Sequence, residues 1–158
     1  MGLKKDDLSE NKPSESSLGP WHVNLIFIDG KKCLLFVNDK TLFNFIVPDI
    51  LRAQIRELSK IFTDTLECVL SAEGVPEMAK TKIMSEYESI QYANTNSKSV
   101  LGSMNDLAFH YKYHIQSEGG VHSYAIPSII KKLNHMPMSA LNFVFPIEAL
   151  KAVYANAT

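Results

Sequence analysis

The sequence has little cysteine and no long hydrophobic run, and these two absences argue against disulfide frameworks, thiolate zinc sites and membrane-spanning helices. Only Cys33 and Cys68 occur among 158 residues, and they do not form a C-x-x-C pair. A disulfide framework and a thiolate zinc site are therefore not expected, and both thiols are predicted to stay reduced. No apolar run approaches the roughly 18–20 residues that a membrane-spanning helix needs. We therefore expect no membrane segment.

The chain also lacks an excess of charge of either sign. Lys and Arg total 16 and Asp and Glu total 17, for a net charge of −1. This balance disfavours a nucleic-acid partner, because a protein that binds nucleic acid generally carries a basic surface. Residues 1–18 are polar and lack the apolar core of a signal peptide. With 46% hydrophobic residues, the sequence predicts a soluble cytoplasmic protein.

The first twenty residues differ in composition from the rest of the chain. Residues 1–20 are rich in Lys, Asp, Ser, Glu and Asn and contain two prolines. Such a segment buries too little apolar surface to offset the entropy lost on ordering it. We therefore predict a flexible polar tail over residues 1–20 and one folded domain over residues 21–158.

Alternating apolar residues predict strands at the start of the domain. Residues 21–28 and 31–37 flank Asp29-Gly30, and an Asp-Gly pair favours a type I′ hairpin turn. The resulting register pairs Val23 with Phe36, Leu25 with Leu34, and Phe27 with Lys32. A third strand is expected over residues 41–47, after a turn at 38–40. Residues 142–145 are the candidate for a fourth, short strand.

Apolar residues spaced three and four apart predict the helices. One helix is expected to begin at Pro48-Asp49, and a second begins at Pro76 and carries its apolar stripe to Ile90. Residues 94–97 are expected to be a polar loop, followed by a third helix that ends near Gln116. Two more helices are expected over residues 127–133 and 146–154. The sequence thus predicts an α+β fold, in which an antiparallel three- to four-stranded β-meander packs against about four to five helices.

Small and polar residues gather where the third helix should begin. Ser103 with Asp106 three positions later fits a capping box, and Ser99 is the competing N-cap. Free N–H groups and the helix dipole favour an anion at such an entrance. We predict a binding surface that joins this entrance to the start of the first strand. Its candidate ligand-binding residues are Trp21, His22, Asn24, Lys98, Ser99, Gly102, Ser103, Asn105, Asp106 and His110.

Two of these residues also have purely structural interpretations. Gly102 is typical of a close contact between a helix and a sheet, where a side chain would not fit. Trp21 at the start of a strand is typical of the hydrophobic core. The carboxylate of Asp106 opposes an anion at the helix entrance.

Asp106, His110 and His114 recur every four residues, which is the spacing of metal ligands on one helix face. The helix lacks the Glu that accompanies the first His in metalloproteases. We therefore predict no metal site and no cofactor, and His110 and His114 are only weak metal candidates. Seven positions, about 10 Å along a helix, separate Ser103 from His110. This separation excludes a Ser–His–Asp triad within the helix.

Three blocks of the sequence resemble an uncharacterised bacterial family. Its W-H-A-N-L strand corresponds to W-H-V-N-L at residues 21–25, and its basic hairpin with a Leu-Phe-Val strand corresponds to residues 31–37, followed by Thr41. Its N-R-S-x-L-G-S-M-N-D-x-A-F motif corresponds to residues 97–109. The resemblance covers about residues 21–150. It implies a domain type and no particular activity.

The chain departs from this family in two ways. Ser97-Lys98 replaces Asn-Arg, and Gly30 replaces a hairpin arginine, so functions that need bidentate arginine contacts are not expected. Family members also tend to start earlier, with a further strand. We therefore expect one uncovered sheet edge that pairs with a protein partner or with a second copy.

No assembled catalytic set accompanies these small and polar residues. The sequence therefore favours a binding or accessory module that acts through the Ser99–Asp106 helix entrance. One alternative is a hydrolase or nuclease-like enzyme that uses His110 and Asp106. Another is a structural subunit of a larger complex. Whether the protein is an enzyme stays open at this level.

Overall fold

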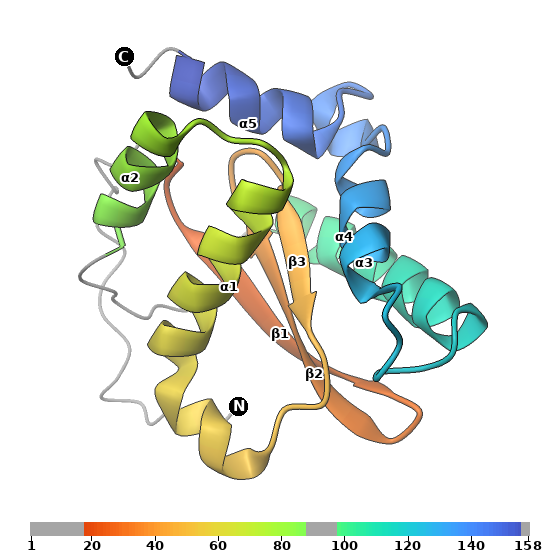
Figure 1. Ribbon diagram of the computed structural model, residues 1–158. Coiled ribbons are helices and arrows are strands. Elements are labelled where there is room, and N and C mark those ends of the chain that lie inside the picture. The colour runs from red at the N-terminus through yellow and green to blue at the C-terminus, as the bar shows by residue number, and fades with distance from the viewer. Residues whose placement is uncertain (1–17, 88–97, 156–158) are drawn as a thin grey trace.

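Three antiparallel strands form the centre of the fold (Figure 1). The computed structural model describes residues 18–87 and 98–155; most of the predicted tail, Ile90 and the expected loop at 94–97 lie outside the described residues. The strands are β1 (Trp21–Ile28), β2 (Lys31–Asn38) and β3 (Asn44–Val47), in the order β1-β2-β3. Together with the helices they confirm the α+β fold.

The hairpin between β1 and β2 has the expected register. Val23 lies opposite Phe36, and Leu25 lies opposite Leu34. Asp29 and Gly30 have φ values of 52° and 76°, the left-handed conformations that a type I′ turn requires. The Asp-Gly pair therefore fixed the turn, and the turn fixed the pairing.

The third strand is shorter than predicted because Thr41 belongs to the turn before it. The Asn38 side-chain oxygen accepts hydrogen bonds from the backbone and the hydroxyl of Thr41, at 2.9 and 2.8 Å. Both residues are fully buried, so the turn is held by its own side chains. The ladder between β2 and β3 begins only at Asn44.

Within the described residues, five α-helices and two 3₁₀ helices follow the sheet. Their bounds are η2 (Arg52–Glu57), α1 (Leu58–Ala72), α2 (Glu77–Ser85), α3 (Lys98–Ser117), α4 (Ile126–Asn134), η3 (Ser139–Leu141) and α5 (Pro146–Ala155). The expectation of a helix starting at Pro48-Asp49 is wrong. Asp49 has a φ of 52°, and the backbone N–H of Ile50 donates to the carbonyl of Lys32. The chain therefore still follows the sheet at this point.

The fourth strand expected at residues 142–145 does not form. Asn142 and Phe143 have φ values of 53° and 67°, which no extended strand accommodates. Only a single bridge between Met138 and Val144 is present there. Tertiary contacts have overridden the local β preference of this apolar run.

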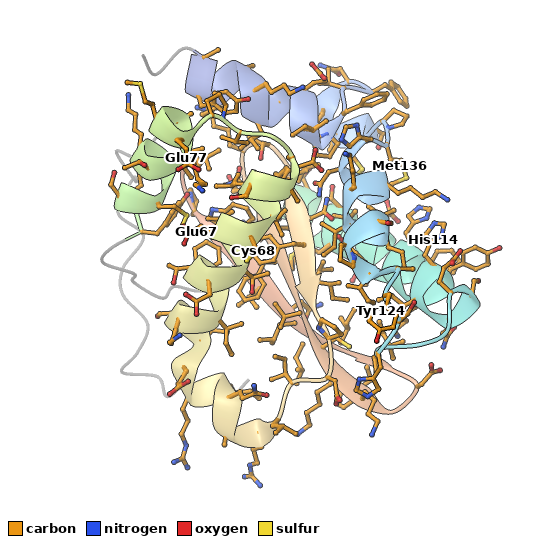
Figure 2. All side chains as sticks on the ribbon, in the orientation of Figure 1. Glu67, Cys68, Glu77, His114, Tyr124 and Met136 are labelled. Atoms are coloured by element: carbon orange, nitrogen blue, oxygen red, sulfur yellow. The ribbon has the colours of Figure 1, made fainter. Side chains whose placement is uncertain are left out.

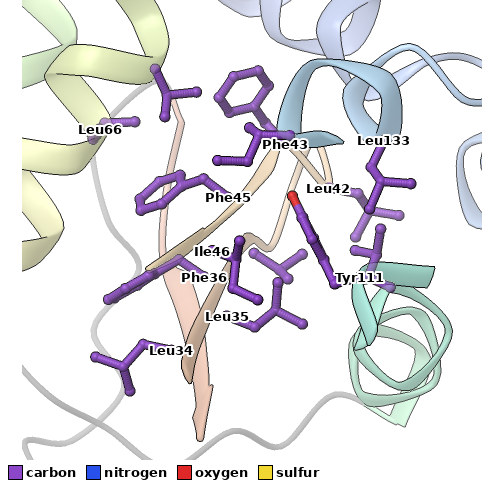
Figure 3. Packing of buried hydrophobic residues seen from close by; sticks show 14 of the residues in the cluster. Leu34, Leu35, Phe36, Leu42, Phe43, Phe45, Ile46, Leu66, Tyr111 and Leu133 are labelled. Carbon is purple, nitrogen blue, oxygen red and sulfur yellow. The ribbon is translucent and has the colours of Figure 1, made fainter. Parts of the chain in front are cut away.

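Helices cover both faces of the sheet. In Figure 1, α1 crosses one face, while α3 and α4 lie on the other. Phe36 and Phe45 stack at 5.0 Å between ring centroids and meet Phe62 of α1. Figure 3 shows Tyr111 reaching from α3 toward the opposite side of the same sheet. No helix within the described ranges is long and apolar enough to cross a membrane.

Residues 18–20, which the sequence assigns to the tail, belong to the folded part. Leu18 is fully buried in the hydrophobic core. Its carbonyl accepts a hydrogen bond from the Asn38 side chain at 3.0 Å. The carbonyl of Gly19 likewise accepts one from the Tyr87 hydroxyl at 2.9 Å. The sequence gives no sign of this contact, because a single leucine in a polar segment carries no periodicity.

Candidate functional site

Helix α3 is anchored to the sheet along one side. Its buried residues are Val100, Ser103, Met104, Leu107, Tyr111 and Ile115. They recur at spacings of three and four and therefore share a face. The opposite face of the same helix is consequently held in a fixed position toward solvent.

Exposed apolar side chains follow that outer face. Leu101, Asn105, Phe109 and Tyr113 recur every four residues and form one row, which we call the α3 row. The exposed fractions of Leu101, Phe109 and Tyr113 are 45%, 69% and 61%. Large apolar side chains that lie together at a surface mark interaction sites for proteins, membranes or ligands.

Two histidines lie on the flank of α3 beside this row. The ring centroids of His110 and His114 are 6.4 Å apart, and their planes differ by 18°. Phe109 meets His110 edge-on, and Tyr113 meets His114 edge-on, at 5.9 and 5.3 Å. The histidines and the aromatic residues of the α3 row thus form one continuous surface.

The electrostatic surroundings of His114 disfavour its charged form. Burial lowers the pKa of His114 most, and the positive charges of Lys132 and His110 lower it further, while Glu118 opposes them. Figure 2 labels His114 on α3, the helix that packs beside α4, which carries Lys132. Its imidazole is therefore expected to be neutral at neutral pH.

The predicted helix entrance is not where the helix begins. Ser99 and Ser103 both lie within α3, which is helical from Lys98 to Ser117, so neither residue is the N-cap. Ser103 lies inside the helix and is buried, and the capping box with Asp106 is therefore wrong. Gly102 faces open space, with nothing within 4 Å of a Cβ placed there. It does not serve a close contact with the sheet.

The predicted strand residues are divided between the two faces of the sheet. Trp21 packs against Phe45 and Phe62 at 5.6 and 5.3 Å, on the α1 side. Side chains alternate along a strand, so His22 and Asn24 point to the other side. The single surface predicted from Trp21, His22 and Asn24 therefore does not form, and Trp21 is a partly buried residue that packs against the core.

His22 is engaged in a local contact within the sheet. Its Nε2 atom lies 2.8 Å from a carboxylate oxygen of Asp39, and its side chain is only 10% exposed. Asn24, by contrast, is exposed. The His22–Asp39 pair joins β1 to the turn that follows β2, which gives His22 a structural role.

A buried polar network beneath α3 is the feature that sequence reasoning missed. The Tyr111 hydroxyl donates to the side-chain oxygen of Asn44 at 2.6 Å. The Asn134 side chain accepts from the backbone N–H of Asn44 at 2.9 Å and donates to its carbonyl at 2.7 Å. Asn134 thus pairs with the edge strand β3 as a neighbouring strand would. In the sequence, the only sign of this network is that polar residues interrupt apolar runs. No local pattern indicates that Asn44 and Asn134, which are 90 positions apart, are partners.

The Tyr111→Phe variant tests this network through its pH dependence. Burial raises the pKa of Tyr111 well above its usual value of 10.0, so the unfolded chain ionises before the folded one does. The stabilisation is complete below pH 10 and is lost as the pH rises further. We expect the variant to be less stable by about 1–3 kcal/mol at pH 8 and the deficit to shrink by about 1.4 kcal/mol at pH 11.

Urea unfolding of both proteins at the two pH values measures this change. Tyr124→Phe is the matched control, because Tyr124 is fully exposed. A constant difference between the Tyr111→Phe variant and the unmodified protein at both pH values would contradict the assigned burial of the hydroxyl.

The metal spacing on α3 brings only the two histidines together. Across residues 18–87 and 98–155, no group of three or more His, Cys, Asp or Glu side chains is placed to hold a metal ion. Asp106 is exposed on the outer side of the helix, while His110 and His114 are half-buried. The side chains of α3 thus offer a hydrophobic contact surface with an adjoining imidazole pair.

Comparisons with known proteins place the chain in a family without an assigned role. The model of a family described as a domain of unknown function (DUF6933) matches residues 1–149. No curated protein and no solved structure matches the chain.

Proposed function

The chain belongs to the DUF6933 family, and from that premise we propose that its domain is a protein-binding module whose contact surface is the α3 row. The observation that carries this proposal is the exposure of Leu101, Phe109 and Tyr113, at 45%, 69% and 61%, on one face of an anchored helix. Aromatic residues are enriched at binding hot spots. A helix that binds in an apolar groove presents its anchor residues at spacings of three and four positions, and the residues of the α3 row recur every four positions.

The rigidity of α3 supports the same proposal. Tyr111 is fully buried and bonded to Asn44, and Leu107 and Ile115 are fully buried on the same side. A surface that is already ordered loses little conformational entropy on binding. The polar side chain of Asp106 adjoins the row and fits the polar rim of an interface.

Another exposed apolar group offers a matched comparison. Phe143 is 70% exposed, almost the same as Phe109 at 69%. However, Phe143 lies in an irregular loop and has a left-handed φ of 67°. The two phenylalanines therefore separate the effect of exposure alone from that of a place on the α3 row.

Site-specific photo-cross-linking tests the proposal. A benzophenone amino acid replaces Phe109 in one variant and Phe143 in another, and cells that naturally make the protein are irradiated. We expect a discrete protein adduct from position 109 and none from position 143. Tyr113→Ser added to the first variant should reduce the adduct roughly tenfold, as the loss of a neighbouring hot-spot side chain does.

The mass of the adduct distinguishes the kinds of partner. An adduct of twice the monomer mass identifies a second copy, and any other discrete mass identifies a different protein. An adduct from position 143 alone, or equal adducts from both positions, would refute the α3 row as the contact surface. Unfolding curves of each variant confirm that the domain is intact.

A further inference from the structure

His110 and His114 place two imidazoles next to each other on one face of α3. They lie one turn apart on α3, with ring centroids separated by 6.4 Å and nearly parallel planes. Side chains at this spacing lie on one face, with Cβ atoms about 5–6 Å apart. Two histidines four positions apart on a helix are a known pair of metal ligands, and rotation of their side chains turns a nitrogen of each toward one ion at a bond length of about 2 Å.

The neighbouring side chains limit the freedom of both rings. Phe109 and Tyr113 contact His110 and His114 edge-on, and the helix beneath them is anchored by Tyr111. Two ligands held next to each other on an anchored helix lose less entropy on binding a metal than two ligands on mobile segments do. Both rings also remain partly accessible to solvent, so water can fill the remaining positions around an ion.

Against the expectation of no metal site drawn from the sequence, we propose that His110 and His114 bind one divalent transition-metal ion, with water completing its coordination. Neutral imidazole suits Cu²⁺, Ni²⁺ and Zn²⁺, whereas Mg²⁺ and Ca²⁺ prefer oxygen ligands. The order of affinities should place Cu²⁺ above both Ni²⁺ and Zn²⁺. This site does not depend on a protein partner and is thus independent of the proposed binding function.

Two charged side chains near the histidine pair are expected to change its metal affinity in opposite directions. Lys132 of α4 lies close enough to disfavour positive charge on His114, and Glu118 near the end of α3 favours it. With two protein ligands, the site should bind more weakly than the three- and four-ligand sites of zinc proteins. Replacing Lys132 with Gln should therefore strengthen binding, which a site elsewhere on the protein would not show.

Titration of the full chain with CuSO₄, and separately with ZnCl₂, tests the assignment by calorimetry. His110→Gln and His114→Gln should each lower the affinity roughly tenfold or more, because each removes one of two ligands. His122→Gln is the control, since His122 lies near Asp49 and its side chain is 74% exposed. Equal binding by the unmodified protein and both α3 variants would overturn the proposal. So would an equal loss in the control.

Nuclear magnetic resonance gives a second measurement that needs no variant. The chain has five histidines, and Cu²⁺ broadens the signals of nearby protons. We expect the ring signals of His110 and His114 to broaden at the lowest Cu²⁺ concentrations, before those of His22, His122 and His135. Earlier broadening at any of these three would place the site elsewhere and refute the assignment.

Discussion

Replacing Asn134 with alanine should lower the free energy of unfolding by about 3–5 kcal/mol. Asn134 is fully buried, and its side chain bonds both the N–H and the carbonyl of Asn44. Truncation leaves these backbone groups buried without partners, at about 1–3 kcal/mol each. The side-chain amide of Asn44 also loses its 3.1 Å contact with Asn134. Urea unfolding monitored by circular dichroism measures the loss.

Asn105→Ala is the matched control for this variant. Asn105 lies on the exposed side of α3, where alanine is the better helix former. Its substitution should change stability by no more than about 0.5 kcal/mol. Hydrogen exchange adds a local measurement, because the amide of Asn44 should exchange faster in the Asn134→Ala variant. A stability loss below 1 kcal/mol, with the Asn44 amide still protected, would contradict the proposed edge pairing.

Replacing Phe45 with alanine should cost about 3–5 kcal/mol, the usual range for a buried phenylalanine. Phe45 is fully buried and touches the rings of Trp21, Phe36 and Phe62, at 5.6, 5.0 and 6.1 Å. Its removal leaves a cavity between the sheet and α1 that these aromatic side chains cannot fill without moving. Urea unfolding measures the cost.

The sole tryptophan reports on the same cavity. Trp21 stands against Phe45 and Phe62, so its fluorescence should shift to the red as water reaches its ring. Phe143→Ala is the control, because Phe143 is 70% exposed and should change stability by no more than about 0.5 kcal/mol. Similar losses for the two phenylalanines would show that the sheet and α1 do not form the principal core.

The sequence indicated that the candidate site lies on α3, but it did not indicate which surface of that helix is exposed. It placed Asn105, Asp106 and His110 together on α3, because spacing on a helix follows from the sequence alone. It selected the small residues of the presumed entrance and overlooked Phe109 and Tyr113. Aromatic residues at helical spacing predict a core, and only the structure shows which of two apolar faces is left uncovered.

The same division holds for the fold as a whole. The sequence by itself determined the β1–β2 hairpin, because Asp29-Gly30 fixes a turn through local backbone sterics. It also determined the helices that begin at or just after Pro76 and Pro146, since proline favours the first turn of a helix. These features depend on neighbours along the chain.

Only the tertiary structure decided the features that depend on distant residues. Asn134 forms a hydrogen bond with Asn44, which lies 90 positions away in the sequence. Residues 142–145 connect η3 to α5 and do not form the strand that their composition favours. The burial of Leu18 and the opposite orientations of Trp21 and His22 likewise follow from which elements cover each face. A short-range pattern carries no information about such contacts, because their free energy appears only when the whole core assembles.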